Sequence, residues 1–123
     1  MNASADSYPA QHFDALAEIA KTLGHAHRLV LLEHVAQGER AVERLAELSG
    51  LSVANTSQHL QHLRRAGFVQ TRRDGKRVLY RLGTGPVAQL LAALRGYAEH
   101  QRAERERRPH DVREHDAGQH GVR

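Results

Sequence analysis

The sequence predicts a mainly α-helical chain of five helices, with one β-hairpin between the fourth and fifth helices. Three observations predict this fold class. Apolar residues recur at helical spacing in several segments, glycines stand where these segments end, and one segment alternates apolar and polar residues around an Asp-Gly pair. The core is expected to be aliphatic, because the 123 residues include only 4% aromatic residues and no Trp.

The length of 123 residues fits one folded domain with a tail at each end. We expect a flexible arm over residues 1–11, a folded domain over 12–105 and a disordered His-rich tail over 106–123, because both ends are polar and aperiodic. The chain lacks the run of roughly 18 apolar residues that a membrane helix needs, and its N-terminus lacks a secretory signal pattern. The expected location is therefore the cytoplasm, with no membrane partner.

The first three helices are predicted between residues 12 and 48. The first begins at His12 and ends before Gly24, which follows the last residue of an apolar stripe. The second covers residues 27–36 and stops at Gly38, and the third covers residues 40–48. Each places its apolar residues on one face, so the three helices are expected to pack together.

Gly50 and Ser52 predict a tight turn between the third helix and a fourth helix over residues 53–66. Glycine tolerates the unusual backbone angles of such a turn, and serine is a favoured residue immediately before a helix. Together with the two flanking helices, this turn forms a helix-turn-helix. The residues of the fourth helix that are expected to be buried are Val53, Leu60 and Leu63.

The first two turns of the fourth helix carry hydrogen-bonding side chains instead of the Lys and Glu that are usual on a solvated helix. Amides and hydroxyls of this kind can read base edges in the major groove of DNA. The predicted DNA contacts on this helix are Asn55, Thr56, Ser57, Gln58, His59, Gln61, His62 and Arg64. For His59, the sequence leaves open both a phosphate contact and packing.

Residues 68–73 and 76–82 alternate as strands do, and Asp74-Gly75 between them predicts a tight hairpin turn. Residues 64–81 hold seven basic residues and one acidic residue, a local net charge of +6 in a chain of net +4. Charge alone fits either a solvated surface or a phosphate-binding one. Beside a helix-turn-helix, it predicts a wing that grips the phosphate backbone or the minor groove. The predicted wing contacts are Arg72, Arg73, Lys76 and Arg77.

A fifth helix begins after residues 83–86 and continues into charged residues. Its apolar stripe cannot be stable alone in water, so we expect it to pack against the first helix and the same helix of a second copy. The predicted dimer-interface residues are Phe13, Leu16, Ile19, Val87, Leu90, Leu91, Leu94 and Tyr97.

The order of these elements, with NTSQHLQHLRRAGFV at residues 55–69 and RDGKRVLYRL at residues 73–82, resembles the ArsR/SmtB family of bacterial winged helix-turn-helix repressors. The resemblance spans about residues 12–100. It implies a homodimer that binds an inverted repeat in double-stranded DNA near its own promoter and releases it when an inducer binds. Two-fold symmetry leads to the same picture, with two recognition helices about 34 Å apart.

The sequence does not identify the inducer. Because the chain has no Cys, it cannot contain the cysteine-based metal or persulfide sites of this family. Of the positions that carry the family's metal ligands on the fifth helix, His100 alone holds a good ligand. Ten His residues keep nickel or zinc open, with His100, His12 and His110 as candidate ligands, whereas His25, His27 and His34 are expected to cap or pack. The alternatives are a small molecule, a regulatory protein partner or no inducer.

An enzyme is not expected, because the chain has no Cys nucleophile and no Gly-rich phosphate loop. Ser57 and His59 cannot form a catalytic pair on one helix, since residues two apart point to different sides. A protein-interaction module is the remaining alternative. The charge of +6 on residues 64–81 argues against it, because such a module has no need of a basic hairpin.

Overall fold

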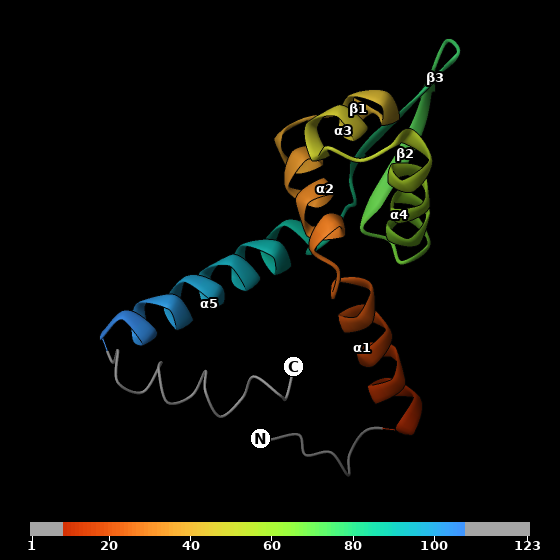
Figure 1. The fold of residues 1–123 in the computed structure, drawn as a ribbon. Helices are drawn as coiled ribbons and strands as arrows, with labels where there is room; N and C mark the ends of the chain where they lie inside the picture. The colour runs from red at the N-terminus through yellow and green to blue at the C-terminus, as the bar shows by residue number, and fades with distance from the viewer. Residues whose placement is uncertain (1–8, 108–123) are drawn as a thin grey trace. The chain divides into compact units, whose positions relative to one another are not determined.

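The structure is a computed structural model that describes residues 9–107. These residues divide into two compact units that separate after Val87. The helices of the first unit are α1 (Ala10–Thr22), α2 (Ala26–Gln37), α3 (Val42–Ser49) and α4 (Val53–Arg65), and its strands are β1 (Arg40–Ala41), β2 (Val69–Asp74) and β3 (Arg77–Leu82). The second unit holds nearly all of α5 (Val87–Arg107). The predicted fold class of five helices and a β-hairpin is confirmed (Figure 1).

A short strand that the sequence did not predict adds a third member to the sheet. The strand order is β1-β3-β2, and both pairs are antiparallel. Arg40 pairs with Tyr80 and Ala41 with Leu79, so the expectation of a third helix that starts at residue 40 was wrong by two residues. Helix α3 begins only at Val42, because the preceding backbone is extended along β3.

The hairpin between β2 and β3 turns one residue later than predicted. Asp74 pairs with Arg77, which leaves Gly75 and Lys76 as the two loop residues. Gly75 has φ 68°, and no non-glycine residue among those described has a positive φ. A positive φ at the first loop residue alone is the pattern of a type II′ turn, which requires glycine at that position. The tip of this hairpin, the wing, projects beyond α3 and α4 (Figure 1).

The core of the first unit is mainly aliphatic, as predicted, although Phe68 and Tyr80 are also buried. Helix α2 contacts α3, α4 and β3, and α4 contacts β2. The fully buried side chains are Leu31, Leu32, Leu45, Thr56, Leu60, Leu63 and Val69. Val53 was expected among them, but it is 47% exposed. The buried line of α4 runs through Thr56, Leu60 and Leu63, and Val53 precedes this line in the first turn.

Two helices extend beyond their predicted ends. Helix α1 starts at Ala10, two residues earlier than expected, and α5 continues through Arg107. The predicted arm over residues 1–11 and the predicted tail over 106–123 were therefore each too long by two residues. Apart from Pro9, which precedes α1, the remainder of both segments lies outside the described residues. Within residues 9–107, no helix combines the length and the hydropathy that crossing a membrane requires.

Gly83, directly after β3, is predicted to tolerate no side chain. A Cβ there would lie 2.3 Å from the carbonyl oxygen of Gly67, and the Gly83 N–H donates to the Phe68 carbonyl over 2.8 Å. We expect Gly83→Ala to lower the free energy of unfolding by about 1–3 kcal/mol, because backbone must shift to admit the methyl group. Urea denaturation followed by circular dichroism measures this change.

Gly96→Ala in α5 is the matched control for Gly83→Ala. Beyond the adjacent residues and the backbone of its own helix, the added Cβ has no atom within 4 Å. This change should therefore raise the free energy of unfolding by about 0.5–1 kcal/mol through helix propensity. Equal effects of the two substitutions would contradict the steric argument.

Candidate nucleic-acid interface

The turn between α3 and α4 has the geometry that Gly50 and Ser52 predict. Gly50 has φ 74° and donates its N–H to the carbonyl of Ala46 over 2.9 Å, which ends α3. The Ser52 hydroxyl oxygen accepts the Asn55 N–H over 3.0 Å, which caps the start of α4. The predicted helix-turn-helix is confirmed, and α4 occupies the place of its recognition helix.

The prediction that Thr56 contacts DNA is wrong. Its side chain is fully buried, and its hydroxyl donates to the Ser52 carbonyl over 2.8 Å. A threonine in a helix often forms this bond to the carbonyl four residues earlier. Thr56 therefore belongs to the core of the helix-turn-helix and cannot reach a base edge.

The outward side of α4 carries a shallow groove of about 390 Å³. We call its lining residues the reading face, and they are Ser57, Gln58, Gln61, His62 and Arg65. Four of these five were predicted as DNA contacts. Arg65 was missed, although its spacing of four from Gln61 and seven from Gln58 places it on the same face. Asn55 and Arg64, also predicted contacts, are exposed on the same helix.

The basic side chains of the wing differ in whether they have a partner within the chain. Arg73, Lys76 and Arg77 are exposed at and beside the tip. Arg72 instead donates to both carboxylate oxygens of Glu39, over 2.8 and 2.7 Å. This hydrogen-bonded pair lowers the pKa of Glu39 and raises that of Arg72. Arg72 thus has a partner within the chain that a phosphate would have to replace.

His59 packs inward, which answers the question that the sequence left open for this residue. Its Nδ1 accepts the Arg28 Nε–H over 3.3 Å, and its ring centroid lies 6.2 Å from that of His25 and 5.9 Å from that of His27. Arg28 is 8% exposed and also donates to the Thr22 carbonyl over 3.1 Å. The start of α2 and the middle of α4 are therefore joined through a buried arginine.

This arrangement predicts that acid destabilises the fold. Desolvation and then the charge of Arg28 lower the pKa of His59, and the same two causes lower that of His62. Below pH about 6.5 the unfolded chain consequently binds more protons than the folded one. The melting temperature should be constant above that pH and fall as the pH decreases below it.

His59→Gln should reduce this fall between pH 7.5 and pH 5.5, because the substituted side chain takes up no proton. His100→Gln on exposed α5 is the matched control and should keep the wild-type fall. Thermal denaturation at constant ionic strength checks both variants. An unaltered pH dependence in His59→Gln would remove His59 from this mechanism.

The candidate metal ligands do not form a metal site among the described residues. Within residues 9–107, no group of three or more His, Asp or Glu side chains is placed to hold a metal ion. His100 lies 4.0 Å from a Glu104 carboxylate oxygen on α5, and the His12 ring makes an edge contact with Phe13 on α1. His110 lies outside the described residues.

The predicted dimer-interface residues divide into two groups by exposure. Val87 and Leu91 are only 9% and 7% exposed, so they offer little area to a second copy. The others expose between 37% and 62% of their surface, and they are Phe13, Leu16 and Ile19 on α1 and Leu90, Leu94 and Tyr97 on α5. Leu29 and Val30 of α2, which are not among the predicted interface residues, are also large exposed apolar residues.

A family model described as bacterial regulatory proteins of the arsR family matches residues 26–71, from α2 into β2. The chain is 38% identical over 91 residues to the HTH-type transcriptional regulator Rv0324 of Mycobacterium tuberculosis, and this match covers 74% of the chain and only 40% of that protein. It is 40% identical over 79 residues to the biofilm growth-associated repressor of Xylella fastidiosa, covering 64% of the chain and 69% of that protein.

Among solved structures, the fold is similar to the homodimeric winged helix-turn-helix DNA-binding domain Mb0332 of Mycobacterium bovis, described as a possible ArsR-family transcriptional regulator. The TM-score is 0.71 at 37% sequence identity, and the match covers 80% of this chain and 91% of that one. The helix-turn-helix, the wing and both comparisons point to the same family. The chain belongs to the ArsR family of bacterial regulatory proteins, which are DNA-binding transcriptional regulators.

Proposed function

We propose that this protein is a homodimeric repressor in the cytoplasm that binds an inverted repeat in double-stranded DNA, and that an effector modulates this binding. The observation that carries the proposal is the placement of two complementary surfaces on one unit. The reading face of α4 offers amides and a hydroxyl for base edges, and the wing offers exposed cations for phosphates.

Dimerisation is supported by the apolar residues that the chain leaves exposed. Phe13, Leu16 and Ile19 recur every three residues along α1, and Leu90, Leu94 and Tyr97 form a similar stripe on α5. Stripes of this kind are stable in water when a second surface covers them. The homodimer of the Mb0332 domain supports the same assembly.

Fluorescence anisotropy with the protein's own upstream DNA tests the proposal, together with sedimentation of the free protein. The expected result is a dimer that binds a site with two half-sites about 34 Å apart, and that binds one half-site much more weakly. A monomer in sedimentation, or equal affinity for upstream and random DNA, would reject it.

The unequal state of the wing arginines predicts unequal contributions to DNA binding. Arg77→Ala should weaken binding to all sequences similarly and reduce the salt slope by about 1 per subunit, because one phosphate contact is lost. Arg72→Ala should change the slope less, since Glu39 occupies its guanidinium in the free protein. Anisotropy titrations at several salt concentrations measure both slopes. A larger change for Arg72→Ala would mean that DNA displaces Glu39.

That the effector is a transition metal such as nickel or zinc stays a prediction. In the same assay, nickel, zinc and cobalt are added to metal-stripped protein, before and after truncation at Arg108. A shift in DNA affinity of tenfold or more that survives truncation would place the metal site outside the tail and make His100 the first residue to substitute. Tight DNA binding that ignores all three metals would reject metal sensing.

A further inference from the structure

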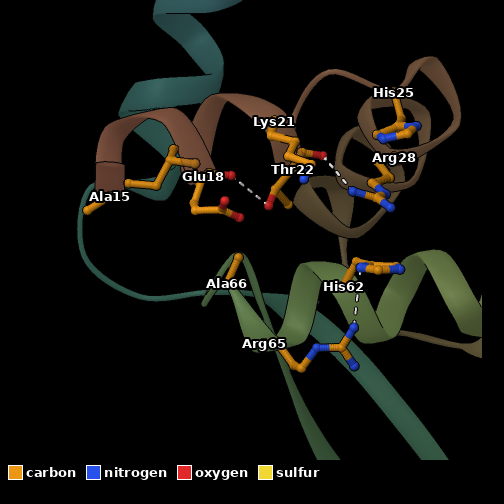
Figure 2. Close-up of a pocket in the computed structure, with 10 residues that line it drawn as sticks. Ala15, Glu18, Lys21, Thr22, His25, Arg28, His62, Arg65 and Ala66 are labelled. Atoms are coloured by element: carbon orange, nitrogen blue, oxygen red, sulfur yellow. Dashed lines mark hydrogen bonds between the residues drawn. The ribbon is translucent and has the colours of Figure 1, made fainter. Parts of the chain in front are cut away.

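A cleft of about 580 Å³ lies beside the DNA-binding elements and has no role in the function proposed so far. It is bordered by α1, the start of α2 and the C-terminal half of α4 (Figure 2). Its lining includes Ala15, Lys21, Arg28, His62, Arg65 and Ala66. Its volume is in the range of small-molecule sites, which is about 300–1,000 Å³.

Arg28 gives this cleft a buried positive charge. The guanidinium belongs to a residue that is 8% exposed, and its two hydrogen bonds go to the Thr22 carbonyl and the His59 ring. Neither acceptor carries a negative charge. A buried cation is costly unless an anion compensates it. Arg28 also has five N–H donors, so these two bonds leave donors for a ligand.

Two further cations and one carboxylate line the cleft beside Arg28. Lys21 comes from α1 and Arg65 from α4, and Glu18 is the one carboxylate among the lining residues. Three cations against one anion disfavour a metal ion here, although four His residues lie on or near this site. They favour a ligand with a negatively charged group.

We propose that this cleft binds a small organic acid, with its carboxylate at Arg28 and its aliphatic part against Ala15 and Ala66. A carboxylate can accept two N–H groups of one guanidinium, which suits the donors that Arg28 has left. Ala15 lies on α1 and Ala66 directly follows α4, on either side of the cleft (Figure 2). They provide the surface that a bare inorganic anion would leave unused.

Occupation of the cleft is coupled to DNA binding through two residues that belong to both sites, a step that rests on the proposed function. His62 and Arg65 line the cleft and also the reading face. An Arg65 Nη atom lies 3.2 Å from His62 Nδ1, so the two side chains contact each other (Figure 2). A carboxylate that attracts Arg65 into the cleft removes it from the DNA. In this proposal the organic acid is the effector instead of a transition metal, and it weakens DNA binding.

Binding to the site is tested without DNA, by NMR titration of the ¹⁵N-labelled full chain with hexanoate, hexanamide and inorganic phosphate. Hexanoate should bind roughly tenfold more tightly than hexanamide, because the amide lacks the charge, and more tightly than phosphate. Equal binding of hexanoate and hexanamide would overturn the proposal. Tighter binding of phosphate would overturn the assignment to an organic acid.

Variants locate the site. Lys21→Gln and Arg65→Gln should each weaken hexanoate binding roughly two- to fivefold, as expected for exposed ion pairs, whereas Arg102→Gln on α5 should leave it unchanged. An equal loss in Arg102→Gln would show attraction by overall charge and overturn the site. Arg28→Gln should abolish hexanoate binding, and circular dichroism shows whether this variant folds. If it does not fold, the variants at the exposed Lys21 and Arg65 still test the site.

Coupling is tested by anisotropy on the upstream DNA with saturating hexanoate. Affinity should fall roughly 5- to 150-fold for the wild type. Lys21→Gln should need roughly two- to fivefold more hexanoate for the same fall. An unchanged wild-type affinity would overturn the coupling. Failure to bind the DNA at all would reject the proposed function instead, and the NMR titration would still decide the site.

Discussion

Leu60→Ala is expected to lower the free energy of unfolding by about 2–5 kcal/mol. Leu60 lies in the middle of α4, is fully buried and belongs to the core that α2, α3 and α4 share. Truncation removes the burial of its side chain and leaves a cavity that the surrounding helices can fill only in part. Because a small domain is stable by only about 5–15 kcal/mol, a large share of the folded protein's stability would be lost.

Val53→Ala on the same helix is the matched control for Leu60→Ala. Val53 is 47% exposed, so its truncation should change the free energy of unfolding by about 0.5 kcal/mol or less. Urea denaturation at one fixed protein concentration measures both variants, since a dimer's stability depends on concentration. A loss in Leu60→Ala no larger than that in Val53→Ala would mean that α4 does not depend on this core.

The parts of the fold that the sequence predicts are those with a local cause. Gly50 and Ser52 act on their own turn, through a left-handed backbone angle and a cap to Asn55, and the structure has both. Gly75 likewise determines the wing turn, although the pairing of Asp74 with Arg77 moves the loop by one residue. Such signals depend on residues a few positions apart, so one sequence is enough to recognise them.

The features that the sequence did not reveal depend on contacts between distant residues. Strand β1 is two residues long, too short for any alternation, and it forms only because β3, some 40 residues later, pairs with it. The pair between Glu39 and Arg72 spans 33 residues. For Thr56 the sequence predicts a groove contact, because a hydroxyl can bond a base edge or its own helix. Only the burial of Thr56 in the fold distinguishes the two.

Arg28 is the clearest example of a feature that depends on contacts between distant residues. Arginine at the start of a helix is normally solvated, and nothing near it in the sequence marks it as buried. Its burial requires the meeting of α2 with α4, where His59, 31 residues later, accepts its Nε–H. The reading face could be predicted because it is a stripe on one helix, whereas the cleft could not, because three elements form it.

Gln58→Ala is expected to weaken binding to the cognate site by about 1–3 kcal/mol, roughly 5- to 150-fold, and to leave binding to random DNA almost unchanged. Gln58 is exposed on the reading face, opposite the buried line of α4. An amide can form two hydrogen bonds with adenine in the major groove, and the wrong base or a missing amide loses both. The phosphate contacts of the wing act on every sequence alike, so they maintain binding to random DNA.

Gln37→Ala at the exposed end of α2 is the matched control, because it removes the same amide away from the reading face. It should leave both affinities unchanged. Anisotropy titrations of the two variants on upstream and random DNA at one salt concentration make the comparison. Equal losses on both DNAs in Gln58→Ala would show that Gln58 contacts the backbone, and base reading would then have to come from Ser57 and Gln61.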